Sequence, residues 1–175
     1  MRTFSQRVLG AALLNAEVYE EVEADSRATS QAIVVVLLAG VAGGIGLAGF
    51  GAVRNLVAGV IVALVGWVAW AALTYLIGTR LLPQSQTQAD VGQLLRTIAF
   101  AAAPGVLRAL GVIPLLGFPI YVIVSLWMLV AMIVAVRQAL DYTSTGRAVA
   151  VCAVGWALSL ALATIIGILF PSSVS

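Results

Sequence analysis

Five long apolar stretches, each about the length of a membrane-spanning helix, restrict this chain to one class of fold. A helix needs about 20 apolar residues to cross the ~30 Å hydrocarbon layer of a bilayer. The sequence therefore predicts an all-α integral membrane protein. We expect an N-terminal cytoplasmic amphipathic segment at 1–30 and a five-helix transmembrane domain at 31–175. The predicted spans are residues 32–53, 56–78, 94–116, 118–136 and 148–170.

The basic residues orient these spans across the membrane. All nine are arginines, and only Arg54 lies in an odd-numbered loop between predicted spans. Short cytoplasmic loops carry an excess of Arg and Lys. We therefore expect a multi-pass protein of the plasma or inner membrane, with its N-terminus cytoplasmic and its C-terminus outside. The arginines assigned to the cytoplasmic side are Arg2, Arg7, Arg27, Arg80, Arg96, Arg137 and Arg147.

Composition argues against most catalytic functions. Hydrophobic residues make up 62% of the chain and charged residues 9%, far below the ~25% charged residues of soluble domains. The net charge of +2 is too small to indicate nucleic-acid binding. The chain has no histidine, so it lacks the usual acid–base catalyst and the usual haem and metal ligand. It also contains no common hydrolase or phosphate-binding motif. We expect no enzyme activity, catalytic residue, cofactor or metal site.

The N-terminal segment has one apolar helical stripe. Asn15 interrupts it as a candidate helix cap, with Glu17 in the next turn. The pattern predicts two short helices hinged near Asn15. Their polar face is acidic after residue 16, so apolar burial or docking on the rest of the protein must hold them, rather than attraction to anionic lipid. The stripe consists of Phe4, Val8, Ala11, Leu14, Val18 and Val22.

The first predicted span is rich in glycine. Gly40 and Gly44 form a GxxxG pair, and Gly51 follows on the same span. Helices in lipid associate through close backbone contact, which small residues permit. These glycines indicate either tight packing against another span of this chain or a face that binds a second membrane protein.

Arg108 is the one charged residue well inside a predicted span. It follows Pro104 and Gly105, and proline removes a helix hydrogen bond and favours a kink. A charge within the bilayer is costly, by ~2.5–3.5 kcal/mol on insertion scales. Pro104, Gly105 and Arg108 are therefore a candidate site for an anion, a lipid headgroup or a substrate. The alternative is that Arg108 extends to the nearby headgroups.

Charged residues also gather at the predicted cytoplasmic ends of the spans. The capping-box pattern of Asp90 with Gln93 predicts the start of the third helix. The charged residues indicate either a salt-bridge cluster that fixes the loops or a surface for a cytosolic partner. The candidate cluster consists of Asp90, Arg96, Arg137, Asp141 and Arg147.

A series of short motifs extends over nearly the whole chain. They are 13–15 (LLN), 18–21 (VYEE), 93–96 (QLLR), 103–105 (APG), 113–117 (IPLLG), 126–127 (LW) and 146–148 (GRA). Their order, with the count of five spans, resembles a bacterial member of the Yip family, which is named for its interaction with Ypt/Rab GTPases in eukaryotes. Many relatives have a proline after the asparagine that matches Asn15, whereas this chain has Ala16.

The resemblance implies a cytoplasmic N-terminus and, for eukaryotic relatives, membrane-trafficking adaptors that bind small GTPases and other membrane proteins. Those relatives have long cytosolic N-terminal regions, whereas this chain has about 30 residues there, so we expect no GTPase binding. We predict a non-enzymatic membrane scaffold or accessory subunit. Its partners would be membrane lipids and other integral membrane proteins or further copies of itself. The alternative is a small transporter, channel or lipid-handling protein that uses a kinked third helix with Arg108.

Overall fold

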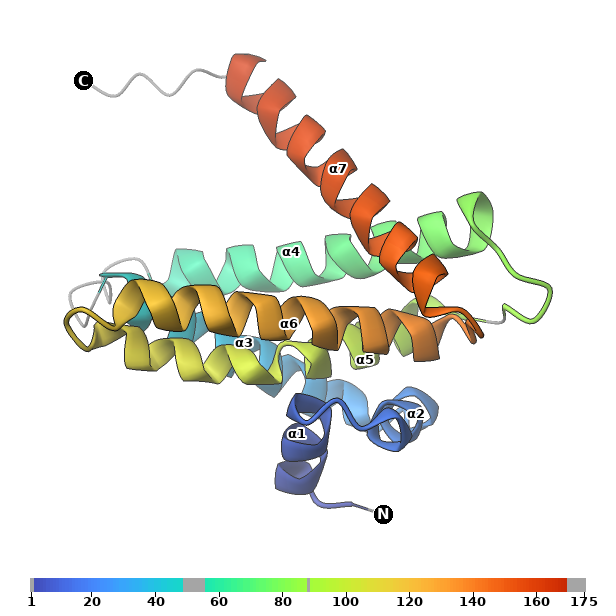
Figure 1. Ribbon diagram of the computed structural model, residues 1–175, viewed down its shortest axis with the longest axis horizontal. Coiled ribbons are helices and arrows are strands. Elements are labelled where there is room, and N and C mark those ends of the chain that lie inside the picture. Colours follow the sequence, from blue (N-terminus) through green and yellow to red (C-terminus); the bar gives the residue numbers. More distant parts are fainter. Residues whose placement is uncertain (1, 49–55, 88, 170–175) are drawn as a thin grey trace.

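A computed structural model describes residues 2–48, 56–87 and 89–169. Every regular element within these ranges is a helix (Figure 1). Gly51, Arg54 and the predicted ends of the first and fifth spans lie outside the described residues. The elements are α1 Phe4–Ala12, α2 Ala16–Ala24, α3 Ala28–Ala48, α4 Leu56–Leu76, the π-helical turn η2 Ile77–Leu81, α5 Val91–Ala101, the 3-10 helix η3 Ala103–Val112, α6 Gly117–Ala139 and α7 Thr145–Leu169.

The helices confirm the predicted all-α membrane fold. Within the described residues, four helical segments are long and apolar enough to cross a bilayer: Ala28–Gly46, Ala63–Leu81, Val91–Val112 and Gly117–Ala139. The helix of the fifth predicted span, α7, has 25 residues and is apolar from Thr145 to Ala161. The first span begins four residues earlier than expected, at Ala28, after a turn in which Asp25 Oδ1 accepts from the N–H of Arg27 at 3.0 Å.

The helices α3, α4, α5 with η3, and α6 run side by side as a bundle (Figure 1). The helices α1 and α2 lie against one flank of this bundle, where they contact α5 and α6. In contrast, α7 packs on the bundle through its first turns and then diverges from it (Figure 1). Among its residues whose burial is described, Ala148, Val151, Cys152 and Gly155 are buried, whereas Trp156 is 57% exposed.

The third span is broken, as the proline predicts. The helix α5 ends at Ala101, and η3 starts with Pro104 in its first turn. Proline has no N–H to donate and its ring excludes the preceding α-helical turn. The backbone instead tightens, and the N–H of Gly105 donates to the carbonyl of Ala102 at 2.8 Å. The break directs η3 along α3, and this pair makes the most extensive helix contact in the described part of the chain.

Glycines allow α3 and η3 to touch through their backbones. A Cβ at Gly46 would overlap the carbonyl oxygen of Arg108, and a Cβ at Gly111 would lie 3.1 Å from the carbonyl oxygen of Gly46. Gly40 faces α4, because its Cβ would lie 3.3 Å from that of Ala63. Gly44 is exposed, and a Cβ there would meet nothing within 4 Å. The predicted GxxxG pair therefore does not act as one packing unit inside the chain, and Gly46 makes the close contact.

The contact between Gly46 and η3 gives a first prediction. Gly46→Ala should lower stability by about 1–3 kcal/mol, because the added methyl must push two close backbones apart. Gly44→Ala is the matched control on the same helix, and it should leave stability unchanged or slightly raised. Thermal unfolding of the purified protein in detergent measures both. Equal melting temperatures for the two variants would contradict the packing described here.

Candidate functional site

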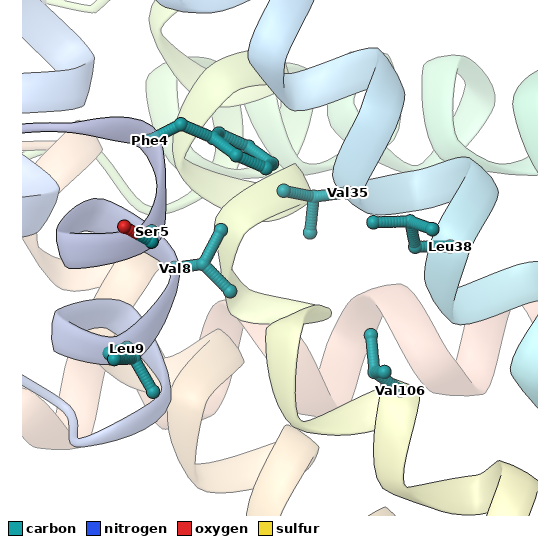
Figure 2. Close-up of a pocket in the computed structure, with 7 residues that line it drawn as sticks. All are labelled: Phe4, Ser5, Val8, Leu9, Val35, Leu38 and Val106. Atoms are coloured by element: carbon teal, nitrogen blue, oxygen red, sulfur yellow. The ribbon is translucent and has the colours of Figure 1, made fainter.

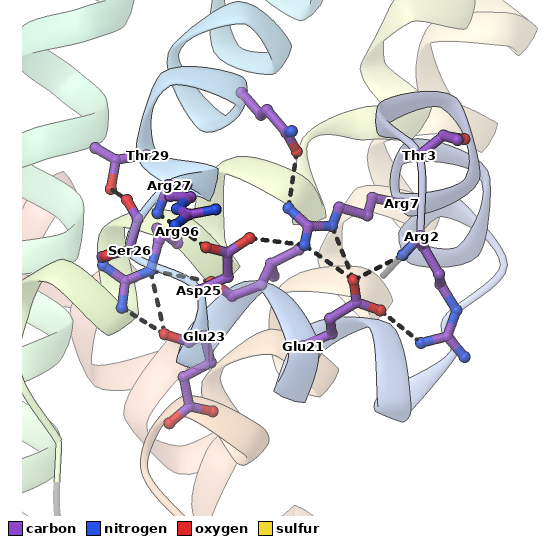
Figure 3. Close-up of polar contacts among 12 residues, drawn as sticks. Arg2, Thr3, Arg7, Glu21, Glu23, Asp25, Ser26, Arg27, Thr29 and Arg96 are labelled. Carbon is purple, nitrogen blue, oxygen red and sulfur yellow. Dashed lines mark hydrogen bonds and ion pairs between the residues drawn. The ribbon is translucent and has the colours of Figure 1, made fainter.

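A buried arginine joins α1 to α2 and α3. Arg7 is 2% exposed, and its Nη2 lies 2.9 Å from Glu21 Oε1 and 2.7 Å from Asp25 Oδ2. Its Nη1 donates to Gln31 Oε1 on α3 at 3.1 Å. Figure 3 shows the guanidinium between the two carboxylates. We call α1 and α2 with the turn between them, residues 4–24, the N-terminal unit, and Arg7 fixes how its two helices lie.

The local sequence explains why the N-terminal unit has two helices. Thr3 caps α1 in a capping box with Gln6. Asn15 caps α2, and its Oδ1 accepts from the N–H of Glu17 at 2.9 Å. Between the helices Leu14 adopts a φ of 62°, a left-handed conformation that reverses the chain. The predicted hinge near Asn15 is confirmed.

The N-terminal unit docks on the bundle through backbone carbonyls. Trp127 Nε1 donates to the carbonyl of Ala12 at 2.7 Å, and Trp127 stands near the middle of α6. At the other end of the unit, Arg96 Nε donates to the carbonyl of Val22 at 3.0 Å, and Arg96 Nη2 donates to that of Glu23. The unit therefore lies along the flank of the bundle instead of only covering its end.

The carboxylates of α2 have very different environments. Partial burial alone would raise the pKa of Glu21, but hydrogen bonds from Arg7 and Arg2 outweigh it and lower that pKa to about 2. The hydrogen bond from Arg7 likewise lowers the pKa of Asp25. Glu23 points away from this cluster (Figure 3). Burial and the nearby Asp141 raise the pKa of Glu23 to about 7, although Arg96 opposes the shift.

The candidate cytoplasmic cluster needs a correction. The structure brings its members to one end of the bundle, but its arginines donate to backbone carbonyls and not to Asp90 or Asp141. Arg147 Nη1 donates to the carbonyl of Pro83 at 2.8 Å, and Arg137 Nε donates to that of Tyr142 at 3.2 Å. Carbonyls at helix ends and in loops lack helical partners and attract cations. Asp90 instead caps α5 and accepts from the N–H of Gln93 at 2.9 Å, as its capping-box pattern predicts.

Arg108 points into the bundle. Its Nη2 donates to Ser125 Oγ at 2.9 Å, and its guanidinium lies 4.8 Å from the centre of the Tyr121 ring. Ser125 is eight residues into α6, which places it about 12 Å from the start of that helix by the α-helical rise. The guanidinium thus lies against α6 within the span, instead of extending beyond the end of η3. Pro104 and Gly105 are buried beside it, and Gly105 packs between Ala39 and Met128.

An apolar groove separates α1 from α3 and η3. Its volume is about 210 Å³. Figure 2 shows Phe4 and Val8 of α1 directed toward Val35 of α3, with Val106 of η3 at the other end. The outer rim is open, because Leu9 is 63% exposed and Leu38 is 48% exposed. The groove is therefore an apolar surface at the membrane-facing flank, formed jointly by the N-terminal unit and the bundle.

The fold and these sites define a multi-pass α-helical membrane protein with a docked N-terminal helical unit. The family model of the Yip1 domain matches residues 13–166. The chain therefore belongs to the Yip1 domain family, and the resemblance seen in its motifs is confirmed at the level of the family. Neither a curated protein nor a solved structure matches the chain.

The Arg7 cluster was missed from the sequence. Its partners Glu21 and Asp25 lie 14 and 18 residues away in the chain and beyond the turn near Asn15, so the spacing of three or four residues that pairs charges on one helix does not join them. One signal was present, because Arg7 falls between Phe4 and Val8 on the apolar face of α1. A charge on a buried face needs an opposite charge or several hydrogen bonds. The acidic α2 supplies both.

Loss of the Arg7 charge should release the N-terminal unit. Arg7→Met leaves Glu21 and Asp25 without their buried partner, and breaking such a pair costs about 3–5 kcal/mol. We expect hydrogen exchange of the backbone amides in residues 4–24 to accelerate strongly while α6 stays protected. Arg80→Met, which changes an exposed arginine, is the control. Unchanged protection of residues 4–24 in Arg7→Met would show that apolar contacts alone hold the unit.

Acid should weaken the same contact. The pKa of Glu21 is lowered from 4.5 to about 2 in the folded protein. Its stabilising contribution is therefore complete above pH 4.5 and is lost as the pH falls toward 2. Hydrogen exchange of residues 4–24, corrected for the intrinsic rate at each pH, should show reduced protection over this window. Glu21→Gln should have lower protection at neutral pH and a smaller change between pH 4.5 and 2.

Proposed function

We propose that this Yip1-domain protein is a non-enzymatic membrane scaffold or accessory subunit that binds other integral membrane proteins. One observation carries the proposal: the apolar groove between α1 and α3 has an open rim of large hydrophobic side chains on the flank of a multi-pass fold. Helices in lipid associate through close van der Waals packing, and a groove lined by large side chains offers such packing to a partner. An apolar helix of a membrane partner has the matching chemistry.

The charge cluster supports this function because it holds the binding surface rigid. Arg7, Glu21 and Asp25 fix α1 against α2, and Trp127 fixes the turn between them against α6. These contacts thus hold α1, which forms one wall of the groove, in the binding conformation before a partner binds. A prepared surface binds with less loss of conformational freedom than a mobile one.

Two further features belong to the proposal. Gly44 is exposed on α3 and leaves space for a close helix contact, so we propose it for a partner face. Gly40 instead packs against α4 within the chain, and Gly51 lies outside the described residues. The arginines favour a cell-membrane protein with a cytoplasmic N-terminus and an external C-terminus.

Photo-crosslinking in native membranes tests the scaffold. A photoreactive residue at Leu9, Leu38 or Val106 should give the same discrete protein adduct, because these side chains surround one groove. The same residue at Val65 on α4, which is 62% exposed, is the control and should not give that adduct. Arg7→Met should reduce the yield at Leu38. Identical adducts at Val65, or no protein adduct from any groove position, would refute the proposed function.

A further inference from the structure

An open crevice beside Arg108 is lined by residues of α3, α4, α5, η3 and α6, and we call it the Arg108 crevice. Its volume is about 330 Å³. Apart from Arg108 the side chains around it are largely apolar or aromatic, with Trp67 and Trp70 on α4 and Met128 and Met132 on α6. Binding sites for small molecules have about this size and this mixture of apolar walls with a few polar groups.

The guanidinium at this crevice has too few partners within the protein. None of the seven acidic residues lies in a predicted span, so no carboxylate neutralises Arg108. An arginine has five N–H donors, and Ser125 Oγ is the one hydrogen-bond acceptor found for Arg108 in the described part of the chain. Among the described residues, two buried side-chain nitrogens have no hydrogen-bond acceptor: Arg108 Nε and Trp70 Nε1. Both residues line the crevice.

The charge and the apolar walls are arranged along the membrane normal. Arg108 lies four residues before the end of η3 at Val112, about 8 Å from the turn by the 3-10 rise. The Arg108 side chain is beside Gly43, and Gly40, one turn deeper on α3, is beside Ala63. From Ala63 the crevice continues along α4 to Trp70, about 10 Å by the helix rise. The cation is thus at the end nearer the membrane surface, and the apolar part extends toward the middle.

We propose that the Arg108 crevice binds one anionic phospholipid, with its phosphate at the guanidinium and an acyl chain between α4 and α6. Arginine pairs with phosphate through two parallel hydrogen bonds. The lipid supplies the negative charge that the spans lack, and its chain fills the apolar walls. This lipid site does not depend on the proposed scaffold function.

Brominated lipids test the site, because bromine on an acyl chain quenches tryptophan fluorescence only at short range. The full chain carrying Trp156→Phe, which removes the lipid-exposed indole, is reconstituted into phosphatidylcholine vesicles. Increasing amounts of brominated phosphatidylglycerol or brominated phosphatidylcholine are then included. Half-maximal quenching should need a several-fold lower mole fraction of the anionic lipid. Equal quenching curves would overturn the proposal.

Two pairs of variants separate the charge from the crevice. Arg108→Gln should abolish the preference for the anionic lipid, whereas Arg108→Lys should keep part of it. Gly66 lines the crevice and has open space at its Cβ position, so Gly66→Leu should fill the crevice without a backbone clash and reduce quenching by the anionic lipid. Ala69→Leu is the control on the same helix, because Ala69 is exposed and lies outside the crevice.

The remaining outcomes also decide the proposal. Helicity measured by circular dichroism identifies a variant that fails to fold. If Arg108→Gln fails, the comparison of Gly66→Leu with Ala69→Leu decides alone. Excess inorganic phosphate should leave the preference unchanged, since a free ion lacks the acyl chain. Loss of the preference on adding phosphate would indicate a small-anion site and overturn the lipid assignment. A preference that persists in Arg108→Gln would do the same.

Discussion

The backbone contact between Gly46 and Arg108 determines much of this structure. Helices in lipid gain no hydrophobic stabilisation from touching, so they depend on close packing of small residues and on interhelical hydrogen bonds. The break at Pro104 lets η3 run along α3, and Gly46 and Gly111 let the two backbones meet. With its main chain held against α3, Arg108 extends its side chain toward Ser125 on α6. The packing that closes the bundle therefore also positions its buried charge.

A different kind of contact attaches the N-terminal unit. Glu21 and Glu23 are two residues apart on α2 and point in different directions, so one meets Arg7 and the other is buried beside Asp141. Their pKa values move in opposite directions from the ordinary value, to about 2 and about 7. Between pH 4.5 and 7 the folded state binds more protons at Glu23 than the unfolded state does, so this residue makes stability fall as the pH rises. Protonation of Glu21 weakens docking as the pH falls below 4.5, and ionisation of Glu23 weakens it as the pH rises from 4.5 to 7. Docking is therefore strongest near pH 4.5.

The sequence predicted features that depend on local pattern. Span length, the cap at Asn15, the capping box at Asp90 and the break at Pro104 each follow from residues within a few positions of one another. Contacts between distant segments could not be read in this way. Arg7 meets carboxylates on another helix, and Arg96 donates to carbonyls more than seventy residues away. A charge pattern in the sequence suggests pairs of opposite charges. It does not show which backbone carbonyls the fold leaves unpaired beside an arginine.

The two proposed sites use different faces of the same pair of helices. Val35, Leu38 and Val106 line the groove beside α1, whereas Val36, Ala39 and Arg108 line the crevice beside α4. Neighbouring positions on α3 and η3 thus face the two sites. A phospholipid at Arg108 would neutralise the one charge in this pair and fill the space behind it, which favours the packed arrangement that the groove requires. Binding energy at the crevice can therefore stabilise the surface offered to a partner, provided that the partner and the lipid prefer the same packing of α3 against η3.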